Sequence, residues 1–145
     1  MKRMCHPLSY SHRNQPRLLF TEVIIMKNFA KTHIENANRS ELHDALTLTG
    51  AEISLNTLPA GTDVPFIHAH KMNEEIYGIL AGQGKVIIDG EEIALTAGDW
   101  LRISPAAKRQ FFAAEDSAIS FICIRQKKIP WKPSPPATPS FTDIS

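Results

Sequence analysis

The sequence predicts an all-β protein, a sandwich or barrel of short antiparallel strands. From residue 51 onward, short segments rich in apolar residues recur, and turn signals separate them every eight to twelve residues or so. All seven glycines lie between Gly50 and Gly98, the part of the chain that contains most of these turns. Such a pattern is typical of antiparallel sheets and argues against an α/β fold.

The predicted strands follow one another along the chain. Ala51–Leu58 alternates between apolar and polar residues and ends at a Pro-Ala-Gly turn. Asp89-Gly90 is a strong two-residue hairpin signal, and it separates Lys85–Ile88 from Glu91–Leu95. Gly82-Gln83-Gly84 is interpreted as a break between strands. The other predicted strands are Ile76–Leu80, Trp100–Ile103, Gln110–Phe112 and Ser117–Ile124.

Composition divides the chain into three parts. Residues 1–35 are an N-terminal arm that we expect to be partly flexible. Residues 36–128 form the predicted barrel. Residues 129–145 are a proline-rich tail, which we expect to be flexible because proline has no amide hydrogen to donate to a sheet.

Two local features precede the first strand. Val23–Ile25 is apolar and could add an edge strand instead of belonging to a flexible arm. Ser40–Ala45 is interpreted as a short helical turn, with Ser40 or Asn38 as its N-terminal cap.

The residues with distinctive chemistry cluster in the middle of the chain. His68 and His70 are two positions apart, so they share a face on a strand but not on a helix. Lys71-Met72-Asn73 is interpreted as a turn that brings Glu75 back on a neighbouring strand. Two neutral imidazoles and a carboxylate that converge predict a divalent transition-metal site with positions open for water or substrate.

With two glycines added, these residues resemble the first sequence motif of the cupins. That motif is a glycine, a spacer, His-x-His, three or four residues, a glutamate, six residues and a glycine. With one extra residue in the spacer, it is filled by Gly61, His68, His70, Glu75 and Gly82. The resemblance covers roughly residues 51–125 and implies a jelly-roll barrel, also called a double-stranded β-helix.

The second cupin motif is present in altered form. The family pattern is Gly, five residues, Pro-x-Gly, two residues, His, three residues, Asn. Here six residues separate Gly98 from Pro105, Ala107 replaces the second glycine, and Ala114 replaces the asparagine. The resemblance thus places Gln110 at the fourth metal-ligand position, as a direct ligand or as a hydrogen-bond partner of a metal-bound water.

Strand alternation adds residues around the predicted metal. Glu75 and Tyr77 share a face and are the candidates for catalysis, whereas Ile79 is expected to be simple core. Lys108 could offer a charge to an anionic substrate. The predicted substrate pocket consists of Phe66, Tyr77, Lys108 and Phe112, of which Phe112 fits simple core better.

Net charge and cysteine content indicate which partners and which cellular compartment to expect. The formal net charge of +1 gives no reason to expect nucleic acid or an acidic membrane as a partner. Cys5 and Cys123 are far apart in the sequence and do not suggest a disulfide framework, and Cys123 is expected to be an inert core thiol. Arg102 and Arg109 are expected on the surface. We therefore expect a cytoplasmic protein whose partner is a small molecule.

Three functions agree with the pattern. The first is a metal-dependent enzyme acting on a sugar or keto acid, either an isomerase or a non-haem iron dioxygenase, with Fe, Mn, Zn or Ni as the metal. The second is a non-catalytic module that binds a small ligand, and the third is a structural cupin without metal. The resemblance also implies a homodimer, because Ile76 and Leu80 lie on the face opposite the metal and need cover.

Overall fold

The computed structural model describes residues 20–35 and 37–127, so the predicted tail and most of the predicted arm lie outside the described residues. Over these ranges the chain forms antiparallel β-strands, and no helix is long and apolar enough to cross a membrane. The strands are β1 (Phe20–Ile25), β2 (Ala30–Ile34), β3 (Arg39–Glu41), β4 (Glu52–Leu58), β5 (Asn73–Ile88), β6 (Glu91–Thr96), β7 (Trp100–Ile103), β8 (Arg109–Ala113) and β9 (Ile119–Lys127).

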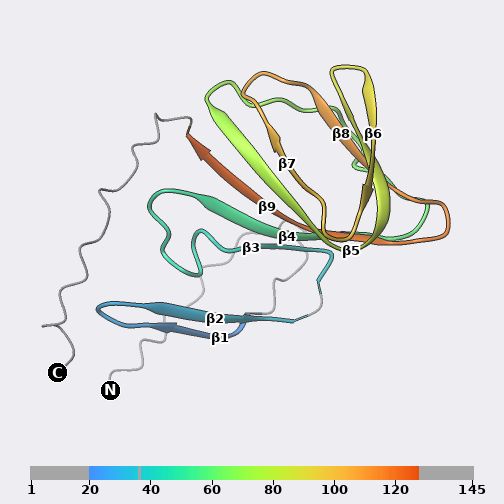
Figure 1. The fold of residues 1–145 in the computed structure, drawn as a ribbon. Helices are drawn as coiled ribbons and strands as arrows, with labels where there is room; N and C mark the ends of the chain where they lie inside the picture. Colours follow the sequence, from blue (N-terminus) through green and yellow to red (C-terminus); the bar gives the residue numbers. More distant parts are fainter. Residues whose placement is uncertain (1–19, 36, 128–145) are drawn as a thin grey trace, which may run out of the picture.

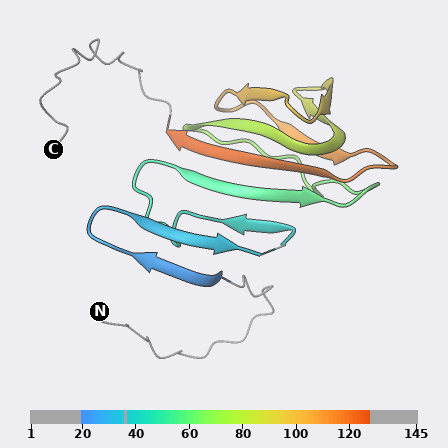
Figure 2. The same cartoon turned by 60° about the horizontal axis from the view of Figure 1, so that its bottom comes forward.

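The long strand β5 joins the two sides of the barrel. Its first half pairs with β7 and β9, and its second half pairs with β6 and β8. Beyond β9 the sheet continues through β4 to β3. Figure 1 shows β5 curving between the two sides, and Figure 2 shows β4 and β9 side by side. The all-β jelly-roll prediction is therefore confirmed.

Strand β5 runs through a predicted break. The sequence predicted that Gly82-Gln83-Gly84 separates two strands, but the segment lies inside one strand of 16 residues. Gly82 has a φ of 77°, and a Cβ there would collide with the backbone carbonyl of Ala118. The glycine therefore allows a bend and a close approach of the neighbouring chain, where the register against β9 shifts.

Aromatic rings fill the centre of the barrel core. The ring of Phe111 lies 4.5 Å from that of Tyr77 and 5.0 Å from that of Phe121, measured between centroids. Ile79 and Cys123 are buried around them, as predicted. Burial raises the pKa of the Cys123 thiol to about 11, so this thiol stays protonated near neutral pH.

The larger sheet of the barrel consists of β3, β4, β9, the first half of β5 and β7, and its outer face is also apolar. Ile76 and Leu80 point away from the core, as predicted, and Leu80 is 52% exposed. Trp100, 61% exposed, lies against Gly78, where an added Cβ would come 2.5 Å from the indole ring. Ile124 of β9 pairs with Ile76 and extends the apolar surface across the sheet.

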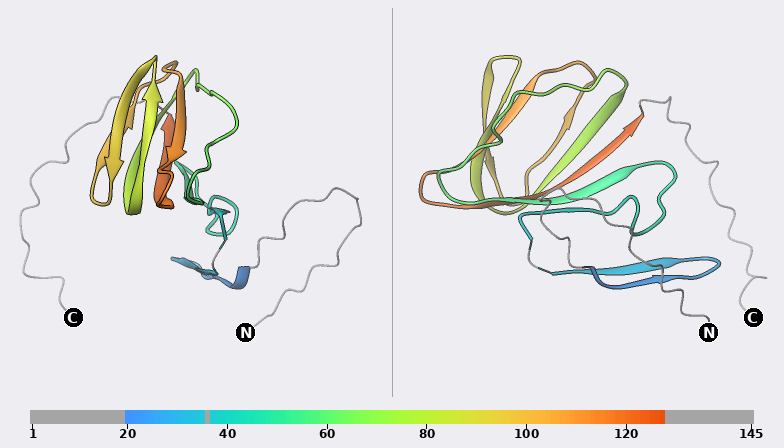
Figure 3. Two further views of the ribbon diagram at one scale, coloured as in Figure 1. Left: turned by 90° about the vertical axis from the view of Figure 1, so that its right-hand side faces the viewer. Right: turned by 180° about the vertical axis from the view of Figure 1, so that it is seen from behind.

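The β1–β2 hairpin does not join the barrel sheet. Its two strands pair with each other in a separate two-stranded sheet. In Figures 1 and 3 the hairpin lies on the side of β3 and β4. Val23–Ile25 is therefore a strand, but it does not extend the edge of the barrel.

The predicted helical turn is displaced along the chain. Ser40 is not its cap, because it is buried within β3. The turn covers residues 43–47, and the amide of Leu46 donates to the carbonyl of Leu42 at 2.9 Å. Its first amides, those of Leu42 and His43, both donate to the carboxylate of Glu52 at 3.2 Å. Glu52, the first residue of β4, therefore supplies the cap.

Candidate metal centre

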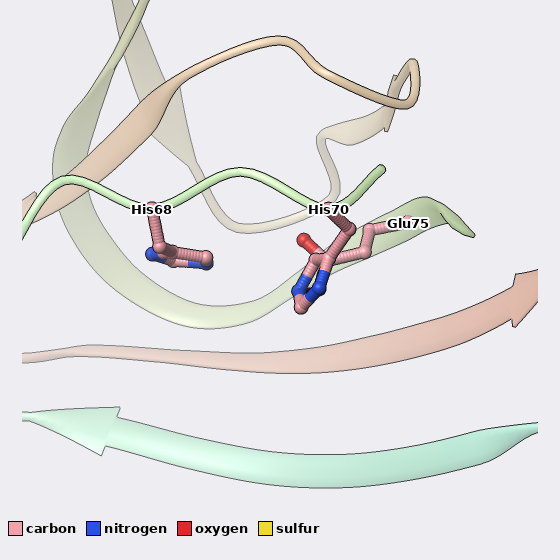
Figure 4. Close-up of side chains that lie close together, drawn as sticks. All are labelled: His68, His70 and Glu75. Carbon is pink, nitrogen blue, oxygen red and sulfur yellow. Dashed lines mark ion pairs between the residues drawn. The ribbon is translucent and has the colours of Figure 1, made fainter. Parts of the chain in front are cut away.

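His68 and His70 lie on an extended segment that is attached to the barrel by a few backbone hydrogen bonds. The amide of His68 donates to the carbonyl of Arg109 at 3.1 Å, and its carbonyl accepts from the amide of Arg109 at 3.0 Å. The carbonyl of His70 accepts from the amide of Ala106 at 2.6 Å. The isolated β-bridge between His68 and Arg109 stands in place of the regular strand that was predicted. The two imidazoles still point to the same side, as predicted (Figure 4).

Strand β5 brings Glu75 to the two imidazoles. The chain bends at residues 71–72, close to the predicted turn, and β5 then begins. Nε2 of His70 lies 2.9 Å from Oε1 of Glu75. One ligand atom from each of His68, His70 and Glu75 lies within 4.8 Å of the others. Three predicted ligands therefore converge.

The other carboxylate oxygen of Glu75 is held by two donors. The hydroxyl of Tyr77 donates to Oε2 at 2.5 Å, and Arg109 donates to the same atom through Nε at 3.1 Å and through Nη2. Burial alone would raise the pKa of Glu75, but these hydrogen bonds and the charge of Arg109 outweigh it and lower the pKa. Glu75 is therefore ionised near neutral pH, with Oε1 toward the imidazoles. Burial raises the pKa of Tyr77, which remains a donor.

His68 is available to coordinate a metal ion. Burial and the nearby charge of Arg109 lower its pKa, although Glu75 acts in the opposite direction. Nδ1 of His68 is buried, and it has no hydrogen-bond partner among the described residues. Leaving a buried ring nitrogen unpaired is unfavourable, and neutral imidazole is the form that binds metals. The donor set therefore fits a divalent transition metal.

Arg109, and not Gln110, reaches the centre from β8. Burial alternates along this strand, and the Arg109 side chain is 0% exposed. Gln110 lies on the opposite face, where its amide donates to the carbonyl of Val64 at 2.9 Å and to the carboxylate of Asp63 at 3.2 Å. The assignment of Gln110 as a fourth ligand is therefore wrong, and so is the placement of Arg109 on the surface.

The family pattern allowed both positions. Counted from Pro105, its histidine position falls on Gln110, whereas counted from Gly98 it falls on Arg109. The backbone agrees with the second count, because Ala106 then occupies the second glycine position and has a φ of 69°. Glycine favours this left-handed region, so the position is consistent with the motif.

A cavity of about 710 Å³ opens beside the three ligands. Phe66 and Tyr77, two residues of the predicted substrate pocket, line this cavity. Lys108 is instead exposed to solvent, and Phe112 lies on the outer face with Nζ of Lys85 5.5 Å from its ring centre. Both were assigned to the pocket because β8 was predicted one residue out of phase.

The opposite wall of the cavity is polar, which the sequence interpretation missed. Ser54 and Asn56 of β4 are buried and line the cavity. Nδ2 of Asn56 donates to Oγ of Ser54 at 3.0 Å, and Arg39 donates to Oδ1 of Asn56 at 2.8 Å. The signal was the alternation of β4, whose apolar residues Ile53 and Leu55 face outward.

Comparisons with known proteins agree with this architecture. Residues 54–125 match the family model described as a cupin domain. A cupin protein of known structure from Bacteroides fragilis is 57% identical, with 76% of this chain and 93% of that chain covered and a TM-score of 0.72. No protein with a curated description matches the sequence.

More distant solved structures share the fold. A sugar phosphate isomerase of the cupin superfamily from Silicibacter pomeroyi is 22% identical, covering 63% of this chain and 60% of that chain with a TM-score of 0.55. KdgF from a Halomonas species is 16% identical, covering 62% of this chain and 78% of that chain with a TM-score of 0.51. At these identities the similarity concerns the fold alone.

Proposed function

Because this chain belongs to the cupin family, we propose that it binds a divalent transition metal through His68, His70 and Glu75 and acts on a small polar molecule. The observation that carries the proposal is the convergence of three ligand atoms within 4.8 Å beside a cavity of about 710 Å³. The proposed reaction is isomerisation or oxygenation of a sugar or keto acid. Iron, manganese, zinc and nickel all accept this donor set.

The chain's own residues divide the work at this centre. A metal bound there would polarise a substrate carbonyl or hydroxyl oxygen. Arg109 balances the charge of Glu75 and keeps one of its oxygens turned toward the imidazoles. Tyr77 is a positioning residue in this proposal, because its hydroxyl donates to Glu75. Phe66 lies at the cavity beside His68, with 5.8 Å between the ring centroids.

One observation favours the alternative of a non-catalytic binding module. An isomerase needs a general base, and Glu75 is already engaged by His70, Arg109 and Tyr77. The other carboxylates that line the cavity are also engaged: Glu52 caps the turn after β3, and Asp63 accepts a hydrogen bond from Gln110. A binding module requires no such base.

Elemental analysis of protein purified without added metal tests the proposal. We expect stoichiometric iron or manganese for an enzyme, and we expect His70→Ala to lose the metal. His33→Ala is the matched control, because His33 is exposed on β2. Full metal content in His70→Ala, or a wild type that retains no metal after reconstitution, contradicts the proposed site. Turnover of sugars or keto acids by the loaded protein then separates the enzyme from the binding module.

We also propose that the protein is a homodimer in which a second copy covers the outer face of the larger sheet. Ile76, Leu80 and Trp100 make this face apolar, and apolar patches of this kind mark interaction sites. Light scattering at micromolar concentration should give twice the chain mass of 16.2 kDa. Leu80→Glu should give the monomer mass, and a monomeric wild type would contradict the dimer.

A further inference from the structure

The cavity contains a guanidinium group that the candidate metal centre does not use. Three arginines lie in or beside the cavity, and two of them are paired. Arg39 donates to Glu41 at 2.6 Å and to Asn56 at 2.8 Å, and Arg109 is paired with Glu75. Arg125 also lines the cavity, and no hydrogen bond or ion pair engages its guanidinium among residues 20–35 and 37–127.

Strand pairing places Arg125 next to the metal centre. In the register of β9, Arg125 lies opposite Glu52 on one side and opposite Glu75 on the other. It continues the inward row of β9 that contains Phe121 and Cys123. The Cβ atoms of directly opposite residues lie about 4.5–5.5 Å apart. The Arg125 side chain therefore begins directly beside that of Glu75, a candidate metal ligand.

The two neighbouring carboxylates are committed to other groups. Glu52 accepts from the backbone amides of Leu42 and His43. Glu75 accepts from Arg109 and Tyr77 through one oxygen and contacts His70 through the other. Arg125 therefore presents its positive charge and its donors to the cavity. A guanidinium forms its strongest pairs with planar anions, above all a carboxylate bound through two parallel hydrogen bonds.

We propose that Arg125 recognises the carboxylate of a small organic acid, whose adjacent carbonyl or hydroxyl oxygen reaches the centre formed by His68, His70 and Glu75. The contact between the carbonyl or hydroxyl oxygen and the metal centre rests on the proposed function. The contact between Arg125 and the carboxylate does not. Phe121 and Tyr77 line the same cavity and offer apolar surface to the carbon chain of the acid. A cavity of about 710 Å³ lies within the range of sites for small molecules, roughly 300–1,000 Å³.

The test compares an acid with its neutral amide, 2-oxobutanoate and 2-oxobutanamide, by calorimetric titration. The wild type should bind the acid at least tenfold more tightly, or about 1.4 kcal/mol. Arg125→Gln should lose this preference, because its affinity for the acid should fall while its affinity for the amide stays unchanged. Arg125→Lys keeps the charge without the planar fork and should retain part of the preference. Arg102→Gln is the matched control on an exposed arginine and should behave as the wild type.

The same titrations with metal-free and metal-loaded protein separate this inference from the proposed function. Arg125→Gln should retain as much metal as the wild type, because Arg125 supplies no ligand atom. If the wild type binds no metal but still prefers the acid through Arg125, the proposed function fails and this inference stands. If Arg125→Gln and Arg125→Lys fold and keep the full preference, or if the wild type shows no preference, the inference is overturned.

Discussion

His68 and His70 lie on a segment between bends that is half-buried and reaches the barrel through a few backbone hydrogen bonds, whereas Glu75 lies within β5 between two paired strands. The Glu75 side chain is 4% exposed, and each of its oxygens has a partner. Nδ1 of His68, in contrast, is buried and finds no hydrogen-bond partner within residues 20–35 and 37–127. Folding therefore holds the carboxylate between two paired strands, whereas only a few backbone hydrogen bonds hold the histidines.

The two sides also differ in how their charges are balanced. Arg109 and Glu75 form a buried ion pair, and removing two charges from water costs several kcal/mol for each ion. Hydrogen bonds from Tyr77 to Glu75 and from Arg109 to the carbonyl of Ala107 offset part of that cost. In the part of the chain that the structure describes, the histidine side contains no such fully buried pair of opposite charges, and the His70 side chain is 25% exposed. Substitutions should therefore affect stability on one side and metal binding on the other.

Arg109→Leu should have the largest effect, because it leaves the buried charge of Glu75 without its partner. We expect a loss of about 3–5 kcal/mol in the free energy of unfolding, measured by urea denaturation. Replacing both Arg109 and Glu75 by leucine should restore part of this loss, because no unpaired charge then remains.

The matched control for Arg109→Leu is Arg102→Leu, which removes an exposed arginine of β7. This change should stay within about 0.5 kcal/mol of the wild type. A loss below about 1 kcal/mol in Arg109→Leu would show that the buried pair does not support the fold.

His70→Ala should separate metal binding from stability on the other side of the centre. Loss of a ligand should weaken metal retention by more than about 100-fold, which corresponds to about 2.7 kcal/mol. The metal-free variant should unfold within about 1 kcal/mol of the metal-free wild type, because His70 is only partly buried. Chelator competition and urea denaturation measure the two quantities. Equal losses in both would mean that the histidine segment is as structural as Glu75.

Tyr77→Phe should produce a smaller loss on the buried side. It removes one hydroxyl donor to Glu75 and leaves the ring in the core, while both Arg109 contacts remain. A hydrogen bond to a charged group is worth about 2 kcal/mol, and that is the expected fall in the free energy of unfolding. No measurable change would indicate that Arg109 alone holds the carboxylate.

Gln110→His should have the smallest effect of all. Gln110 lies on the far face of β8, so an imidazole there cannot reach the metal. Metal retention against a chelator should change less than about twofold, well below the effect of losing a ligand or its support. A tenfold tighter retention would instead restore Gln110 as a neighbour of the metal.

Features that depend on local spacing could be predicted from the amino-acid sequence. His-x-His on extended backbone places both imidazoles on one side, and the turn after it returns Glu75, because both follow from alternation and turn residues over a few positions. Asp89-Gly90 forms its hairpin because both residues adopt positive φ. The strand content and the first motif could therefore be predicted without a structure.

The phase of β8 and the neighbours of Glu75, in contrast, depend on how distant strands pack together. Phe111 and Phe112 are both apolar, so alternation could not show which faces inward, and a shift of one residue exchanges Arg109 for Gln110. The pairing of Phe111 with Val86 of β5 resolves this choice. Arg125 reaches the cavity for a similar reason, since its place beside Glu75 depends on the register between strands far apart in the chain. Such registers follow from the packing of the whole core and not from any short stretch of sequence.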